Sequence, residues 1–217
     1  MSEEDTSAES IRQAASESVA AGEGIRERVR ELTLRALQER RLDLHGTREV
    51  MRAMTEGISL GAQKRGSDVR EALSEAFAGM DQAVSKAAQA SSLALKEMSA
   101  RGREFTDTEL RQGLERMREM ESSLLDSVRD ISRSTGGAVK TEWERLASHA
   151  QHAGTDTGRL VSRTVREFSA RMTTAMSEGA VAGMEAARQF GERFAAMASG
   201  ILAGMSEALR KDRDEKP

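Results

Sequence analysis

The sequence predicts an all-α protein, an elongated antiparallel helical bundle or coiled coil of about four to five long amphipathic helices. From Ile11 to Leu209 an apolar or small side chain recurs every three or four residues, which is the spacing of one helix face. No proline interrupts this pattern before Pro217. Hydrophobic residues make up 38% of the chain and aromatic residues 3%, which is enough for an aliphatic helical core.

The first predicted helix, 7–41, has seam positions at alternating steps of four and three residues, which is the coiled-coil period of about 3.5. Half of these positions carry Ala, Ser or Gly, so a partner helix can approach closely but buries little apolar area per turn. The large apolar members of this seam are Ile11, Ile25, Val29 and Leu32. Gly46, with Asp43 or Thr47 as an N-cap, predicts a break near 42–47.

The second predicted helix, 47–102, is rich in alanine and would exceed about 80 Å at about 1.5 Å per residue. Gly66 and Ser67 mark a point at which it could divide. Gly102 ends it, and 106–109 reads Thr-Asp-Thr-Glu, a capping box in which the first Thr hydroxyl and the Glu carboxylate each accept a backbone N–H bond. We therefore expect a break near 102–106.

The third predicted helix, 106–133, continues the heptad spacing with larger apolar side chains. Its seam consists of Leu110, Leu114, Met117, Leu124, Val128 and Ile131. Glu121 occupies the one position of this seam that is not apolar. A buried carboxylate there would be costly unless it is paired. The adjacent Gly136 and Gly137 then favour a break near 132–137.

The fourth predicted helix, 138–153, is short, and Gly154 and Gly158 favour a break near 153–158. The last predicted helix, 157–210, concentrates Met and Phe on one side, which we name the apolar contact face. Its members are Phe168, Met172, Met176, Phe190, Phe194, Met197, Ile201 and Met205. Core packing is the ordinary explanation for such a face. The alternative is a flexible apolar stripe that adapts to a partner protein, or to a lipid or polymer surface.

These helices form one elongated domain over 7–210. The ends, 1–6 and 211–217, are charged and lack seam residues, so we expect both to be disordered tails. Glycine pairs four residues apart allow two helix backbones to approach closely, and we interpret them as points of tight antiparallel packing. These pairs are Gly57 and Gly61, Gly179 and Gly183, and Gly200 and Gly204.

The composition excludes several classes of function. The chain has no cysteine, which excludes a disulfide scaffold, a thiolate metal site and a cysteine nucleophile. The 36 acidic and 33 basic residues are interspersed, and the net charge of -3 argues against nucleic-acid binding. Residues 1–6 are acidic and polar, unlike a secretory signal, and no stretch of about 20 apolar residues is present. We expect a soluble, cytoplasmic protein without a transmembrane segment.

No residue pattern predicts a catalytic, cofactor-binding or metal site. His149 and His152 lie three residues apart near Glu142 and Glu144, and two solvated histidines are the simpler explanation because the spacing matches no zinc or di-iron motif. An enzyme built inside a helical bundle would need several inward carboxylates and histidines, and only Glu121 falls conspicuously on a seam.

Two stretches have a texture typical of one family: VAAGEGIRERVREL at 19–32 and AAMASGILAG at 195–204. With its cysteine-free helices rich in Ala, Met, Glu and Arg, nearly the whole chain resembles the phasins, which coat bacterial polyhydroxyalkanoate granules, and more closely an uncharacterised proteobacterial phasin-like group. The resemblance implies a non-enzymatic protein that oligomerises through coiled coils and lays an apolar helix face on a granule. It carries over no site residues.

Two functional hypotheses follow from these observations. The first is a helical protein that self-associates and coats an apolar surface such as a polyhydroxyalkanoate granule, using the apolar contact face. The second is a coiled-coil scaffold or adaptor that binds another helical protein and keeps the same face buried. The expected partners are a second copy of the chain, a granule or lipid surface, or a helical protein, and no cofactor is expected.

Overall fold

The computed structural model describes residues 7–40, 44–100, 107–175 and 184–214, and every regular element in these segments is helical. The predicted all-α class is therefore confirmed. The α-helices are α1 (Ala8–Ala20), α2 (Ile25–Glu39), α3 (Leu44–Gln63), α4 (Val69–Ala100), α5 (Asp107–Ser134), α6 (Gly137–Ala153), α7 (Asp156–Ala175) and α8 (Met184–Asp214). A short 3-10 helix, η1 (Gly66–Asp68), precedes α4. The described residues thus form more and shorter helices than the four to five expected.

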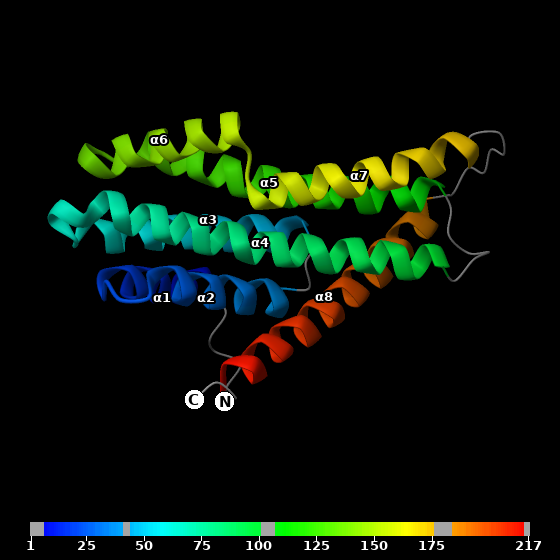
Figure 1. The fold of residues 1–217 in the computed structure, drawn as a ribbon, viewed down its shortest axis with the longest axis horizontal. Helices are drawn as coiled ribbons and strands as arrows, with labels where there is room; N and C mark the ends of the chain where they lie inside the picture. Colours follow the sequence, from blue (N-terminus) through cyan, green and yellow to red (C-terminus); the bar gives the residue numbers. More distant parts are fainter. Residues whose placement is uncertain (1–6, 41–43, 101–106, 176–183, 215–217) are drawn as a thin grey trace.

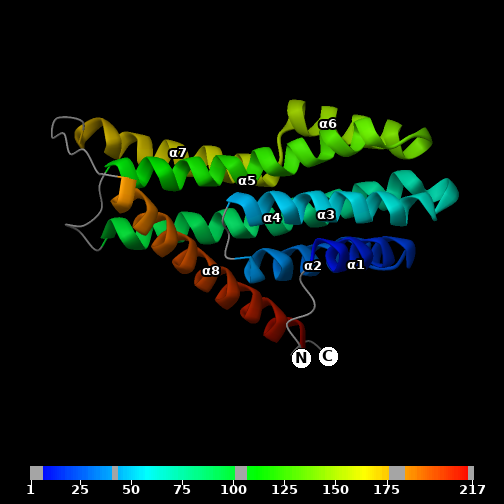
Figure 2. The same cartoon turned by 180° about the vertical axis from the view of Figure 1, so that it is seen from behind.

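The helices form three antiparallel hairpins that lie side by side (Figure 1). The first hairpin is α1 with α2, the second is α3 with α4, and the third is α5 with α6 and α7. Neighbouring hairpins pack α1 on α3, α3 on α5, α2 on α4, and α4 on both α6 and α7. Figure 2 shows the same layers from behind.

Helices in adjacent hairpins run parallel, although the sequence led us to expect antiparallel packing throughout. Gly57 of α3 lies against the Arg12 carbonyl of α1, and Gly61, one turn later, lies against the Ser16 carbonyl. Contacts between α4 and α7 also advance together along both helices, from Asp81 with Thr157 to Lys96 with Glu167. The antiparallel prediction is therefore right for helices within a hairpin and wrong for the pairs α1 with α3 and α4 with α7.

Helix α8 runs obliquely across the molecule and covers the part of α4 that the shorter first hairpin does not reach (Figures 1 and 2). It packs mainly on α4, with smaller contacts to α5 and α2. The Gln38 side chain near the end of α2 donates a hydrogen bond of 3.3 Å to the Leu202 carbonyl of α8. Helix α8 therefore continues the layer that α1 and α2 begin.

The predicted first helix, 7–41, is wrong because the chain reverses at Gly22 and Gly24. Both glycines have left-handed backbone angles, with φ of +83° and +57°. The Arg65 guanidinium packs so closely on Gly22 that a Cβ atom there would lie 2.2 Å from Nη1. The regular seam spacing runs through this turn, so the apolar pattern alone did not reveal it.

Two further predicted helices are interrupted. The chain breaks after Gln63 and η1 precedes α4, so the possible division at Gly66 and Ser67 is confirmed. Helices α7 and α8 run in different directions (Figure 1), so 157–210 is not one continuous helix. Residues 176–183 lie outside the described residues.

The other predicted boundaries agree with the structure to different degrees. The breaks near 132–137 and 153–158 are confirmed, since α5 ends at Ser134 and α6 at Ala153. Helix α3 begins at Leu44, earlier than the predicted position 47. Residues 101–106, with the proposed Thr106 hydroxyl cap, lie outside the described residues. Helix α8 continues to Asp214, so the predicted disordered tail 211–217 begins too early, whereas 1–6 and 215–217 are not described.

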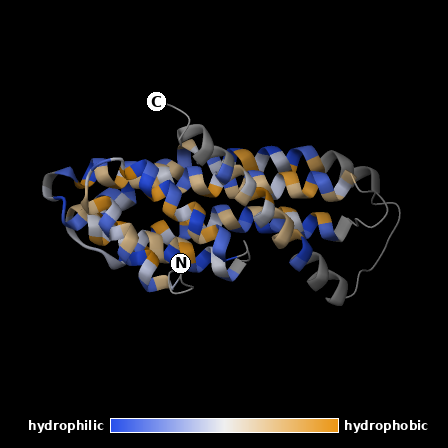
Figure 3. Ribbon diagram, turned by 90° about the horizontal axis from the view of Figure 1, so that it is seen from below, coloured by the Kyte–Doolittle hydropathy of each residue, from blue (hydrophilic) through white to orange (hydrophobic). Residues whose placement is uncertain are grey.

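Hydrophobic and hydrophilic residues alternate along the helices (Figure 3), as expected for amphipathic elements. The core is mostly aliphatic, and its largest fully buried side chains are Trp143, Phe168 and Phe194. The Trp143 indole N–H donates a hydrogen bond of 2.8 Å to Ser59 Oγ, so its polar atom is satisfied inside the core. None of the helices in the described part of the chain is long and apolar enough to span a lipid bilayer.

Candidate functional site

The predicted seam residues all lie at helix contacts within one chain. Leu32 and Ile131 are partly buried against the core. The other members are buried: Ile11, Ile25, Val29, Leu110, Leu114, Met117, Leu124 and Val128. Because these side chains pack against other hairpins of the same molecule, they are not exposed to a partner chain in this structure.

The apolar contact face is divided between the core and the surface. Phe168 of α7 and Phe194 of α8 are both 0% exposed. Met197, Ile201 and Met205 are partly buried against the core. Met176 and the side chains of Met172 and Phe190 lie outside the described part of the structure. The aromatic members that the structure describes are therefore core residues.

Phe194 is the residue that anchors α8. The Arg116 guanidinium of α5 lies 5.8 Å from the centre of the Phe194 ring, within the range of a cation–π contact. Ala198 and Leu202, one and two turns further along α8, are also buried. This side of α8 therefore faces the bundle, and the opposite side faces solvent.

The solvent side of α8 consists of small residues between two charges, and we name it the outward α8 face. Its exposed members are Arg193, Ala196, Gly200, Ala203, Gly204 and Glu207. Their spacing of three and four residues places them on one side of the helix. A Cβ atom added at Gly200 or Gly204 would meet nothing within 4 Å among the described residues.

Other glycines in the bundle stand at close helix contacts. A Cβ atom at Gly57, Gly61 or Gly79 would lie 2.2–2.4 Å from a backbone carbonyl oxygen of a neighbouring helix. At these positions the backbone of a neighbouring helix packs directly on the glycine: α1 packs on Gly57 and Gly61, and α2 packs on Gly79. The predicted tight packing at Gly57 and Gly61 is confirmed, with parallel rather than antiparallel helices.

A polar site joins α4 to the start of α7. The buried Asp81 carboxylate accepts the backbone N–H groups of Asp156, at 2.7 Å, and Thr157, at 3.1 Å. The Thr157 hydroxyl donates to Asp81 Oδ1 at 2.7 Å. Thr155 Oγ1 accepts the Gly158 N–H at 2.8 Å. The first turn of α7 is therefore capped by a side chain from another helix as well as by its own residue.

Glu121 of α5 lies beside this capped turn. A Cβ atom at Gly158 would lie 2.1 Å from Glu121 Oε1, so the carboxylate is directly against the glycine. Burial raises the pKa of Glu121 above its ordinary value of 4.5, and the nearby Asp81 carboxylate raises it further. Glu121 has no ion-pair partner among the described residues, so the pairing that would offset its burial is missing.

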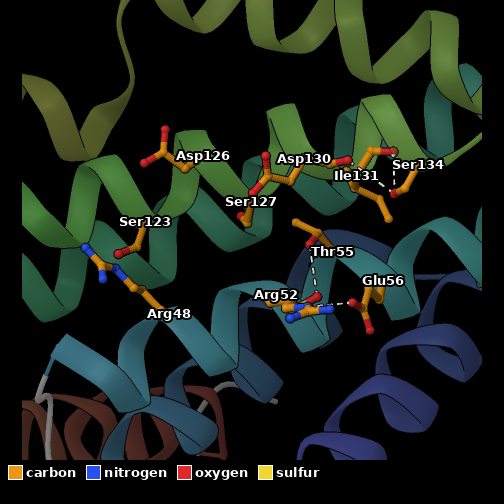
Figure 4. A pocket seen from close by; sticks show the side chains of 10 residues that line it. All are labelled: Arg48, Arg52, Thr55, Glu56, Ser123, Asp126, Ser127, Asp130, Ile131 and Ser134. Carbon is orange, nitrogen blue, oxygen red and sulfur yellow. Dashed lines mark hydrogen bonds and ion pairs between the residues drawn. The ribbon is translucent and has the colours of Figure 1, made fainter.

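A polar cavity of about 550 Å³ lies between α3 and α5 (Figure 4), and we name it the α3–α5 cavity. Its lining combines hydroxyl, acidic and basic side chains with one apolar residue. These are Arg48, Arg52, Thr55 and Glu56 of α3, and Ser123, Asp126, Ser127, Asp130, Ile131 and Ser134 of α5. The volume falls within the range of small-molecule sites.

The histidines do not form a metal centre in the described structure. His149 and His152 are both exposed, and His152 Nδ1 lies 2.7 Å from the Ser148 carbonyl oxygen of its own helix. No group of three or more His, Cys, Asp or Glu side chains in the described segments is arranged to hold a metal ion.

The sequence did not identify the cap or the cavity. The Gly154, Thr155 and Asp156 run signalled a helix start, but nothing in the sequence linked it to Asp81 in the middle of α4. Ser123 and Ser127 stand four residues apart on α5, which is a signal of a shared polar face, but serines are common on exposed helix surfaces.

The fold defines the chain as an all-helical bundle protein. The chain belongs to the family of unknown function DUF6781, whose profile matches residues 1–211. Comparisons with curated proteins and with solved structures find no significant match.

Proposed function

We propose that the protein is a non-enzymatic helical scaffold that self-associates through the outward α8 face. The observation that carries this proposal is the pair Gly200 and Gly204, which is open to solvent although glycines of the same spacing elsewhere in the bundle receive a neighbouring helix. Small residues let two helix backbones approach closely. The outward α8 face therefore suits a second helix.

A second copy of α8 fits this face because the face is complementary to itself. Arg193 and Glu207 each lie seven residues from Gly200, on opposite sides along the helix. If two α8 helices cross antiparallel at Gly200, Arg193 of each copy approaches Glu207 of the other. The same crossing places Ala196 of one copy beside Gly204 of the other. A two-fold symmetric contact of this kind uses one surface patch twice.

The burial of Phe168 and Phe194 also supports a scaffold. Among the described residues the exposed large hydrophobic side chains are Leu60 and Leu93, on α3 and α4. Two leucines on different helices do not form the broad apolar patch that a surface-coating protein presents. A scaffold of this kind keeps Phe168 and Phe194 inside the bundle.

Sedimentation equilibrium of the full chain over a range of concentrations tests the proposal. We expect the wild-type protein to form dimers as its concentration rises, and Gly200→Leu to remain monomeric because the larger side chain holds the helices apart. Gly200→Ala is the matched control, since it keeps a small residue while removing the same glycine, and it should still dimerise. A wild-type protein that stays monomeric, or a Leu variant that dimerises equally well, contradicts the proposal.

A second candidate function is the coating of an apolar surface, such as a polyhydroxyalkanoate granule. The partial exposure of Met197, Ile201 and Met205 on the flank of α8 favours it, because flexible methionines adapt to irregular surfaces. Co-sedimentation with granules, with anionic liposomes as the comparison surface, tests this function. Saturable granule binding that is lost when these three residues are changed to Ser, with helicity retained, supports it. Absence of binding to either surface contradicts the coating function and leaves the scaffold as the one proposed function.

A further inference from the structure

The α3–α5 cavity contains a buried hydrogen-bonding group with no partner. Ser123 is 5% exposed, and its Oγ atom has no hydrogen-bond partner among the residues that the structure describes. Other hydroxyls of α5 donate to carbonyls of their own helix, as Ser122 does to Glu119, at 3.2 Å, and Ser127 to Leu124, at 2.8 Å. A buried hydroxyl without a partner is unfavourable, so Ser123 is suited to a group that enters the cavity.

Arginines from α3 form the opposite wall of the cavity. Figure 4 shows the Ser123 hydroxyl on the side of α5 that faces α3, near the Arg48 guanidinium. Arg48 is exposed and has no ion-pair partner among the described residues. Arg52, one turn further along α3, pairs with Glu56 at 2.9 Å. In Figure 4 the Arg48 guanidinium and the Ser123 hydroxyl lie toward one end of the cavity, and Arg52 lies further along it beside Glu56.

The acidic residues of the lining are already paired along their own helix. Asp126 pairs with Arg129 at 2.9 Å and Asp130 with Arg133 at 3.4 Å. These arginines reduce the negative charge that Asp126 and Asp130 would otherwise present to an anion. The positive charge of Arg48 is the one in the lining that no described partner offsets.

We propose that the α3–α5 cavity binds a small organic molecule through an oxyanion, a carboxylate or a phosphate group. The Ser123 hydroxyl and the Arg48 guanidinium donate hydrogen bonds to the oxyanion, and Arg48 supplies the positive charge that balances it. Guanidinium groups match the geometry of both kinds of oxyanion. Because the cavity is much larger than an inorganic anion, the rest of the molecule lies toward Ser127 and Ile131.

Isothermal titration calorimetry of the full-length protein tests this site. The probes are inorganic phosphate, glycerol phosphate and acetate. Comparison of acetate with the two phosphates distinguishes carboxylate from phosphate recognition. Comparison of inorganic phosphate with glycerol phosphate distinguishes a bare anion from an ester. We expect binding of at least one probe, with glycerol phosphate tighter than inorganic phosphate if phosphate is the recognised group. Ser123→Ala and Arg48→Gln should each weaken that binding about tenfold, as expected for loss of a hydrogen bond to a charged group.

Two matched variants control for general effects. Ser122→Ala removes a neighbouring hydroxyl that is bonded to its own helix, and Arg118→Gln removes an exposed arginine of α5 outside the cavity. Both should bind the probes as the wild type does. Absence of binding for all three probes at millimolar concentration overturns the proposal, as does binding that Ser123→Ala and Arg48→Gln leave unchanged.

Discussion

At the scale of single residues, the clearest long-range interaction is the one in which Asp81 of α4 caps the start of α7. The carboxylate accepts two backbone N–H groups and one hydroxyl from a helix start that lies 75 and 76 residues further along the chain. Capping by a distant side chain fixes both the position and the direction of α7 on α4. Sequence patterns could not reveal it, because an isolated acid among alanines gives no sign of what it faces.

Replacement of Asp81 by Ala should therefore destabilise the fold. The change leaves the Asp156 and Thr157 N–H groups and the Thr157 hydroxyl without this acceptor, and we expect a loss of about 2–3 kcal/mol in the free energy of unfolding. Urea denaturation measures it. Glu71→Ala, which removes an exposed acid from the same helix, should change the free energy of unfolding by less than about 0.5 kcal/mol. Equal effects of the two changes would contradict the capping role.

Glu121 should make stability depend on pH in a definite direction. Because its pKa is raised in the folded protein, the protonated form is favoured by folding. Its contribution to stability is therefore fully present below its ordinary pKa of 4.5 and is lost as the pH rises through the raised value.

Glu121→Gln provides the measurement for this pH dependence, because glutamine is a neutral mimic of the protonated acid. We expect the variant to be more stable than the wild type at neutral pH, with the difference shrinking as the pH falls toward 4.5. Urea titrations at several pH values follow the two proteins. A wild type that equals or exceeds the variant at neutral pH would show that the carboxylate has a stabilising partner.

At the scale of helices, the apolar faces were predictable and the reversals only partly so. The breaks at 132–137 and 153–158 followed from glycines beside hydroxyl residues, and the structure confirms them. The reversal at Gly22 and Gly24 was missed because the buried residues of α1 and of α2 follow the same three- and four-residue spacing, without interruption at the turn. A seam shows which side of a helix is buried, but it does not show that the chain has turned.

Close glycine contacts between parallel helices give a prediction at this scale. Gly57→Ala should lower stability by about 1–3 kcal/mol, because the new Cβ atom would lie 2.2 Å from the Arg12 carbonyl oxygen, a backbone atom that cannot easily move. Gly204→Ala is the control. In the monomer its site is open, so at concentrations at which the chain does not associate the gain in helix propensity should stabilise the protein by up to about 1 kcal/mol. Thermal unfolding followed by circular dichroism compares them, and a Gly57→Ala protein as stable as the wild type would contradict this packing.

At the scale of the whole molecule, the chain stacks hairpins in parallel and uses α8 to complete the layer that the first hairpin leaves short. Amphipathic helices predict that each helix buries one face, but not which helix covers it. The sequence therefore predicted the all-α class and not the stacking order. The same limit applies to the apolar contact face, since its spacing was visible but the burial of Phe168 and Phe194 was not.

Exchange of the charges at the ends of the outward α8 face is the most direct test of self-association. In an antiparallel contact centred on Gly200, Arg193→Glu should weaken the dimer, because it places like charges beside each other twice. The double variant with Arg193→Glu and Glu207→Arg restores both pairs, so sedimentation equilibrium should show its dimer recovering toward the wild-type level. A double variant that dimerises no better than Arg193→Glu alone would contradict the account.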